Sequence, residues 1–164
     1  MQGFLLIDKP DGMTSHDVVD RVRRLTGERR VGHAGTLDPF ATGLLIVAVG
    51  RPATREMKNL VGLDKEYEAV FTLGGTSDTD DRTGVIEVAP IKNTSEEQIK
   101  SALNTFIGDI QQIPPSYSAI KIKGKKMYEA AREGKPLKAD PRKVTIHSIE
   151  NLKILSDTRI SMTI

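Results

Sequence analysis

The spacing of apolar residues divides the chain into predicted strands and helices, because a strand alternates every second residue and a helix repeats every three to four. Strand-like patterns occupy residues 3–7, 44–49, 65–73, 85–88, 144–155 and 159–164. Helical spacing occupies residues 14–25, 53–61 and 94–108. Strands interrupted by helices of unequal length favour an α+β fold over a regular βαβ repeat.

Two of the predicted helices carry recognisable end signals. Thr14 or Ser15 can cap the first helix and Gly27 can end it. Its predicted apolar face comprises Val18, Val19, Val22 and Leu25. Thr94 and Glu97 have the spacing of a capping box for a helix that Gly108 would end. The predicted core face of that helix comprises Ile99, Ala102, Leu103 and Phe106.

The segment 32–43 is the richest in chemistry and reads Gly-His-Ala-Gly-Thr-Leu-Asp-Pro-Phe-Ala-Thr-Gly. Its glycines and proline predict a turn-rich loop, and the apolar run 44–49 after it predicts a buried strand. The loop carries Asp38 and His33, and polar groups on loops braced by strands are common in active sites. The alternative is a structural turn in which Asp38 bonds to nearby backbone.

Composition indicates one soluble globular domain, since 164 residues with 38% apolar and 28% charged residues can form a single core. The absence of cysteine excludes disulfides, thiol catalysis and Cys-ligated zinc, and the three histidines form no close metal-ligand pair. No apolar run could cross a bilayer, and no signal-peptide pattern opens the chain. We therefore expect a cytoplasmic protein without metal or membrane contact.

Charge is distributed unevenly although the net charge is only +2. Residues 121–143 contain nine Lys or Arg against three acids, whereas residues 78–109 contain seven acids against three bases. A second basic cluster comprises Arg21, Arg23, Arg24, Arg29 and Arg30. Such asymmetry suits a face that binds a polyanion, and an ordinary solvated surface is the alternative.

The acidic segment 78–84 is better explained as a polar turn between strands than as a metal loop. An EF-hand starting at Asp78 would need a glutamate at its twelfth position, which is Ala89. No Gly-rich loop has the lysine of a Walker motif or the G-x-G-x-x-G pattern. The sequence therefore predicts no nucleotide cofactor.

The 32–43 segment resembles the catalytic loop of the TruB-type tRNA pseudouridine synthases. Three more segments match that family in order and approximate spacing, at residues 5–15, 64–67 and 112–119. The resemblance covers essentially the whole chain. It implies a mixed, mainly antiparallel sheet flanked by helices and an isomerase that converts the T-loop uridine of tRNA, position 55, without a cofactor.

By this resemblance Asp38 is the catalytic nucleophile, which adds covalently to the nucleotide and divides a difficult step into easier ones. Whether it attacks the sugar or the uracil ring, or first abstracts a sugar proton, stays open. Glycoside hydrolysis is the nearest competing chemistry, but it normally needs a second carboxylate.

The resemblance also assigns contacts with RNA. His33 would occupy the space vacated by a flipped uridine, and Tyr67 would pack on the uracil. A backbone-bonded histidine and a core tyrosine are the respective alternatives. Lys9 and Pro10 match a supporting segment rather than catalytic residues. The further predicted substrate-binding residues are Gly35, Thr36 and Leu37.

A basic hairpin is predicted around Gly124, followed by a short helix at residues 127–133. The family has a mobile insertion here that clamps the T-arm, which implies phosphate contacts from Lys123, Lys125 and Lys126. A plain solvated loop is the alternative.

The chain departs from the family at its end. Members typically continue into a Gly-Thr-Tyr-Ile-Arg segment, whose arginine pairs with the catalytic carboxylate, and many end in a small RNA-binding domain. We therefore expect residues 1–164 to be a single partial catalytic domain, incomplete at the C-terminus, without that RNA-binding domain. Two alternatives stay open: the chain is a truncated product or fragment, or it acts with a separate C-terminal fragment or partner chain. The competing hypothesis is a noncatalytic RNA-binding or RNA-folding module.

Overall fold

The chain divides into two compact units, each described here by itself. The computed structural model describes residues 1–90, 94–118, 120–122, 124–135 and 137–164. The first unit comprises Met1–Lys65 and the second comprises Glu66–Ile164. The expectation that residues 1–164 act as one domain stays a prediction.

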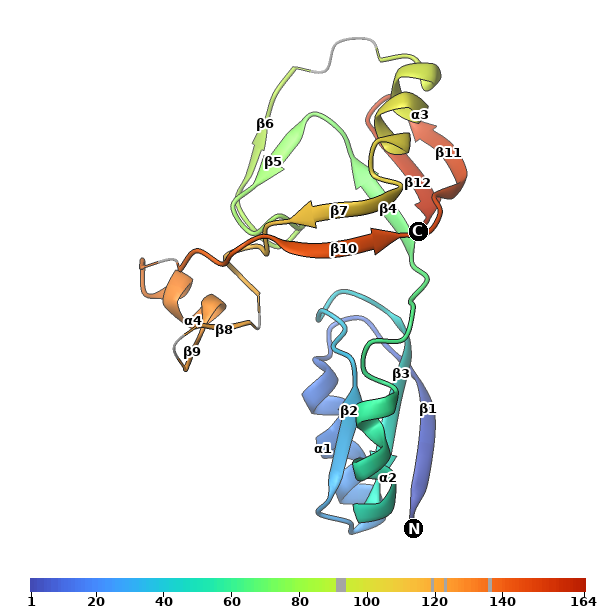
Figure 1. Cartoon of the computed structure of the whole chain (residues 1–164), viewed down its shortest axis with the longest axis vertical. Coiled ribbons are helices and arrows are strands. Elements are labelled where there is room, and N and C mark those ends of the chain that lie inside the picture. Colours follow the sequence, from blue (N-terminus) through green and yellow to red (C-terminus); the bar gives the residue numbers. More distant parts are fainter. Residues whose placement is uncertain (91–93, 119, 123, 136) are drawn as a thin grey trace. The chain divides into compact units, whose positions relative to one another are not determined.

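A three-stranded antiparallel sheet in the order β1-β3-β2 forms the centre of the first unit (Figure 1). β1 spans Gly3–Lys9, β2 spans Val31–Ala34 and β3 spans Gly43–Val49. β1 and β3 confirm the strands predicted at 3–7 and 44–49.

The predicted loop begins later than expected, because residues 32–34 belong to β2 and pair with β3. His33 therefore lies on a strand opposite Val47, and its prediction as a loop residue is wrong. Glycine fits the strand at position 32 because a Cβ there would lie only 3.1 Å from the Met57 sulfur. Tertiary packing thus overrides the turn preference of this segment.

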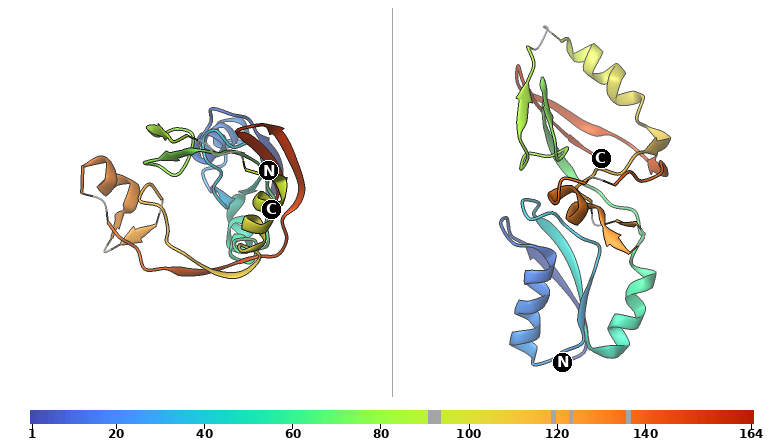
Figure 2. Two further views of the ribbon diagram at one scale, coloured as in Figure 1. Left: turned by 90° about the horizontal axis from the view of Figure 1, so that it is seen from above. Right: turned by 90° about the vertical axis from the view of Figure 1, so that its left-hand side faces the viewer.

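One face of the sheet is covered by α1 (Ser15–Thr26), and α2 (Gly50–Glu56) lies on the other side (Figure 2). Thr14 caps α1, and Gly27 ends it with a φ of +68°. The core between helix and sheet comprises Val18, Val19, Val22, Val31, Leu45, Val47 and Val49. Leu25 is 78% exposed, so the buried face is one turn shorter than predicted.

The helix predicted at 53–61 appears as α2 (Gly50–Glu56) followed by a short 3-10 turn, η1 (Met57–Asn59). It begins earlier than predicted because Pro52 lies in the first turn, where a helix needs no intrahelical N–H donor.

The second unit contains several small antiparallel sheets (Figure 1). The largest has the order β11-β12-β4, with β4 at Glu68–Thr72, β11 at Glu150–Ser156 and β12 at Arg159–Thr163. β5 (Gly75–Ser77) pairs with β6 (Ile86–Val88), and β8 (Lys121–Ile122) pairs with β9 (Lys125–Lys126), which α4 (Met127–Arg132) follows. Every strand pair among the described residues is antiparallel, as the predicted α+β fold requires.

One strand pair was not anticipated. β7 (Gly108–Gln112) pairs with β10 (Arg142–Ile146), so the long strand predicted at 144–155 is divided between β10 and β11. Polar contacts link this pair: Thr145 donates to the Asp109 carboxylate at 2.6 Å, and Lys143 contacts it at 2.8 Å. Apolar spacing could not reveal β7, because its sequence, Gly-Asp-Ile-Gln-Gln, has no alternation of apolar residues.

α3 (Glu96–Asn104) differs from its prediction at both ends. Ser95 and Gln98 form its capping box, in place of Thr94 and Glu97, and Gly108 opens β7 instead of ending the helix. No residue of α3 is buried, and Phe106 is 50% exposed. A mostly apolar pocket of about 340 Å³ separates α3 from Ile160 of β12. The helix therefore packs loosely on its sheet.

Among the described residues, no helix is both long and apolar enough to span a bilayer.

Replacing Thr14 with alanine should lower the free energy of unfolding by about 1 kcal/mol at neutral pH. The Thr14 hydroxyl accepts from the Asp17 N–H, and the Asp17 carboxylate accepts from the Thr14 hydroxyl and from the Thr14 N–H. The two bonds to the carboxylate lower its pKa. A lowered folded-state pKa stabilises the fold only while the carboxyl is ionised, so this contribution declines as the pH falls below about 4 and is lost below the lowered pKa. Urea unfolding at pH 7 and pH 3 measures the effect, and an equal loss at both pH values would contradict it.

Candidate active site

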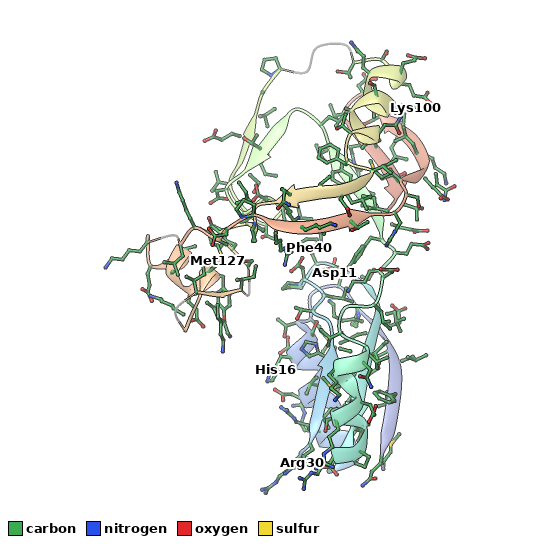
Figure 3. The ribbon with its side chains drawn as sticks, viewed as in Figure 1. Asp11, His16, Arg30, Phe40, Lys100 and Met127 are labelled. Atoms are coloured by element: carbon green, nitrogen blue, oxygen red, sulfur yellow. The ribbon has the colours of Figure 1, made fainter. Side chains whose placement is uncertain are left out.

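The loop between β2 and β3, residues 35–42, carries Asp38 on a tight turn. Gly35 has a φ of +90°, which other residues rarely adopt. The Ala41 N–H donates to the Asp38 carbonyl at 3.0 Å, and proline at the next position supplies the φ that such a turn favours. Phe40 of this turn and Asp11 lie at one end of the first unit, opposite to Arg30 (Figure 3).

Lys9, the last residue of β1, is completely buried and anchors this turn. Its ammonium donates to the carbonyls of Pro10 at 2.9 Å, Met13 at 2.7 Å and Pro39 at 3.2 Å. These three acceptors match the three N–H donors of an ammonium group. The buried charge is therefore solvated by backbone from two loops, which it ties together.

Ser15, the first residue of α1, anchors the same loop on its other side. Its hydroxyl donates to the Leu37 carbonyl at 3.1 Å and accepts from the Leu37 N–H at 3.0 Å. Ser15 is only 2% exposed, and the Leu37 side chain packs against the core of the first unit. Both residues that flank Asp38 are thus held by buried side chains.

Asp38 itself is exposed, and so is Thr36. The Asp38 carboxylate makes no hydrogen bond or ion pair to any residue that the structure describes, whereas its backbone is fixed on both sides. A rigidly mounted carboxylate whose oxygens face solvent can act as a nucleophile, a base or a ligand.

His33 is half-buried at the end of β2 that leads into this loop. Its Nδ1 lies 2.5 Å from the Gly35 carbonyl. A carbonyl oxygen only accepts, so Nδ1 carries the proton and Nε2 is the acceptor nitrogen. The backbone bond expected under the alternative interpretation is therefore present, and it orients the ring. Contact of this ring with RNA stays a prediction.

Tyr67 lies in the second unit, directly before β4. Its N–H and carbonyl pair with Ile164 at 2.8 and 2.9 Å and extend the ladder between β4 and β12. The side chain is 46% exposed, which does not fit a core tyrosine.

The basic hairpin forms as predicted, with β8 and β9 joined around Gly124 and α4 after them. Lys123 lies outside the described residues. Lys125 forms an ion pair with Glu133, and Lys126 lies 3.8 Å from Glu129. Bonding to Tyr128 raises the pKa of the Lys126 ammonium. These two lysines are therefore partly neutralised by acids of the same hairpin and helix.

The acidic segment 78–84 is the polar turn expected between two strands, β5 and β6. Burial pushes the pKa of Asp81 upward, but hydrogen bonds from Thr83 and Thr79 outweigh it, so the pKa is lowered. The described residues contain no group of three His, Cys, Asp or Glu that could hold a metal ion.

The role of Ser15 was not anticipated from the sequence. A serine beside Thr14 indicates only a helix cap, and Thr14 fills that position in the structure. No local pattern reports a bond to a residue 22 positions away. The sequence predicted a supporting role for Lys9, and the structure identifies the three backbone carbonyls that accept its hydrogen bonds.

Comparison with known proteins gives one family. A family model described as TruB family pseudouridylate synthase (N terminal domain) matches residues 23–164. The chain is 49% identical over 152 residues to tRNA pseudouridine synthase B of Desulfotalea psychrophila, covering 92% of this chain and 61% of that protein. It is 48% identical over 153 residues to the protein of the same name from Mycobacterium sp. strain KMS, covering 93% and 51%. The chain thus spans about half to three-fifths of these relatives' length.

Solved structures share the fold. A chain in the crystal structure of a Cbf5–Nop10–Gar1 complex matches 98% of this chain, and 38% of that chain, with a TM-score of 0.68 and 27% identity. A chain in the structure of an H/ACA RNP bound to a substrate RNA containing 2′-deoxyuridine matches 98% of this chain and 36% of its own, with a TM-score of 0.65 and 24% identity. The second match supports the fold alone.

Replacing Lys9 with methionine should lower the free energy of unfolding by about 1–3 kcal/mol, because three carbonyls lose their donor while the aliphatic stem is kept. The matched control is Lys121→Met, an exposed lysine whose loss should change stability by no more than about 0.5 kcal/mol. Urea unfolding of both variants measures the difference, and equal effects would contradict the anchoring role.

Proposed function

The chain belongs to the TruB family of pseudouridylate synthases, and from this premise we propose that it converts a uridine of tRNA to pseudouridine. The observation that carries the proposal is the exposed Asp38 between two residues whose backbone is held by buried side chains. The proposed target is uridine 55 in the T-loop, and the proposed place of action is the cytoplasm. Residues 1–164 would contribute to it as one catalytic domain.

The reaction is an isomerisation that needs no cofactor. The bond from C1′ to N1 of the uracil breaks, a bond from C1′ to C5 forms, C5 loses its proton and N1 gains one. Asp38 is the proposed nucleophile, because covalent addition to the nucleotide divides one difficult step into easier ones. The rigid turn contributes by presenting the carboxylate in one orientation.

Two aromatic side chains are proposed to contact the nucleotide. A stacked uridine must leave its stack to be reached, which leaves a gap in the RNA. His33 suits that gap, because its bond to Gly35 fixes the ring plane. Tyr67 suits the uracil, because it lies directly before β4 and its side chain is 46% exposed. Gly35, Thr36 and Leu37 are the further proposed substrate-binding residues.

The basic hairpin is proposed to contact the T-arm backbone through Lys123, Lys125 and Lys126. Of these, the two that the structure describes already pair with acids: Lys126 with Glu129 of α4, and Lys125 with Glu133, which directly follows α4. Phosphate would therefore have to displace Glu133 from Lys125, so part of the binding free energy is spent on breaking that pair.

Replacing Asp38 with asparagine should abolish pseudouridine formation and leave RNA affinity nearly unchanged, because the amide keeps the shape but is a poor nucleophile. T-arm RNA labelled with tritium at C5 of the target uridine releases label on reaction, and carbodiimide primer extension locates the product. Asp157→Asn is the matched control, because it removes one charge from an exposed turn of the second unit.

Product formation by Asp38→Asn would overturn the assignment of the nucleophile. If the unaltered protein binds T-arm RNA without forming product, the noncatalytic RNA-binding module is the better account. A primer-extension stop at a site other than position 55 would correct the target only.

Replacing Lys125 and Lys126 with alanine should weaken T-arm binding and flatten its dependence on salt, by about 0.9 log units for each lost contact with duplex phosphate. The opposite change is expected for Glu133→Gln, which frees Lys125 from its ion pair and should tighten binding. Fluorescence anisotropy across a salt series measures both. An unchanged slope in the double variant would assign the hairpin to solvated surface.

A further inference from the structure

Ser15 has an unusual position for a residue at the start of a helix. The cap of α1 is provided by Thr14, so the Ser15 hydroxyl is not needed there. It points instead to a residue 22 positions away and satisfies both backbone groups of Leu37. One hydroxyl therefore makes the two hydrogen bonds that a neighbouring strand would otherwise make to Leu37. Ser15 is only 2% exposed.

The location of these bonds gives them a consequence for Asp38. The Leu37 carbonyl belongs to the peptide group that joins Leu37 to Asp38, so a donor on that oxygen restricts the rotation of the whole plane. On the far side, Lys9 holds the Pro39 carbonyl and the Ala41 N–H holds the Asp38 carbonyl. The Lys9 contacts do not involve Leu37. Among the residues that the structure describes, Ser15 makes the hydrogen bonds that hold the Leu37 backbone as the chain enters the turn, and the Leu37 side chain packs against the core.

We propose that Ser15 is a positioning residue for the Asp38 carboxylate: its buried hydroxyl fixes the Leu37 peptide groups and thereby sets the direction in which Asp38 leaves the loop. The inference rests on the proposed function, because its consequence is a rate. Displacement of a reacting group by about 1 Å can slow a reaction by about two orders of magnitude. Ser15→Ala should therefore lower the single-turnover rate constant by about 10-fold to 100-fold while changing RNA affinity by less than about 3-fold.

A merely stabilising role is separated by a matched control at the adjacent residue. Thr14→Ala also removes a hydroxyl at the start of α1 and also loosens the helix, but Thr14 makes no hydrogen bond to the loop. Ser15→Cys preserves the approximate size of the side chain with a weaker donor, so it should give an intermediate rate. It also keeps the test usable if the alanine variant folds poorly.

The experiment measures four quantities for the unaltered protein and the three variants. They are the urea midpoint, the dissociation constant for T-arm RNA, the single-turnover rate constant at saturating protein, and hydrogen exchange of the Leu37 amide by NMR. Support requires a rate loss and faster Leu37 exchange in Ser15→Ala, an intermediate Ser15→Cys, and a Thr14→Ala rate within about 3-fold of the unaltered protein.

Two results would overturn the inference. One is an unchanged single-turnover rate constant in Ser15→Ala. The other is a loss of rate that is the same for Ser15 and Thr14 variants with the same loss in urea midpoint, because stability alone would then explain the rate. If the unaltered protein forms no pseudouridine, the proposed function fails separately. In that case hydrogen exchange of the Leu37 amide is the deciding measurement. Faster Leu37 exchange in Ser15→Ala than in Thr14→Ala supports control of the loop by Ser15, and unchanged Leu37 exchange in Ser15→Ala overturns it.

Discussion

The buried ammonium of Lys9 is the interaction on which the candidate site depends. A charge with no exposed surface is costly unless its hydrogen-bonding capacity is satisfied, and here three carbonyls satisfy it. Two belong to the segment after β1 and one belongs to the Asp38 turn. Neither loop can move away without leaving the charge underbonded. The turn is therefore held by the hydrogen bond from the buried Lys9 to the Pro39 carbonyl, in addition to its own bond from the Ala41 N–H to the Asp38 carbonyl.

In the first unit, different residues stabilise the fold and hold the candidate catalytic loop. Apolar side chains of α1, β2 and β3 form the core. Two buried polar residues, Lys9 and Ser15, donate hydrogen bonds to backbone carbonyls of the loop. The loop at residues 35–42 has no regular secondary structure of its own, and Gly35 within it adopts a positive φ. The hydrogen bonds from Lys9 and Ser15 therefore fix the backbone on both sides of Asp38.

The second unit is organised differently. Few of its described apolar residues are buried, and α3 buries none. β7 and β10 pair through their backbones, and Thr145 and Lys143 add polar side-chain contacts to Asp109 across that pair. The basic hairpin is similarly polar, since Lys125 and Lys126 find acids close in sequence. Local pairing lowers the charge that these lysines present, so a count of basic residues overstates the electrostatic attraction of this segment for a polyanion.

The sequence by itself determined the α+β fold, the strands β1 and β3, the caps of α1, the hairpin around Gly124 and the family to which the chain belongs, because each depends on local spacing or on motif order. Tertiary structure alone decided the rest. His33 lies in a strand because β3 pairs with its backbone, and β7 formed because β10 pairs with it. Leu25 stayed exposed, and no residue of α3 became fully buried. The hydrogen bond from Ser15 to Leu37 was likewise decided by the tertiary structure, since a contact between residues 22 positions apart has no local sequence pattern.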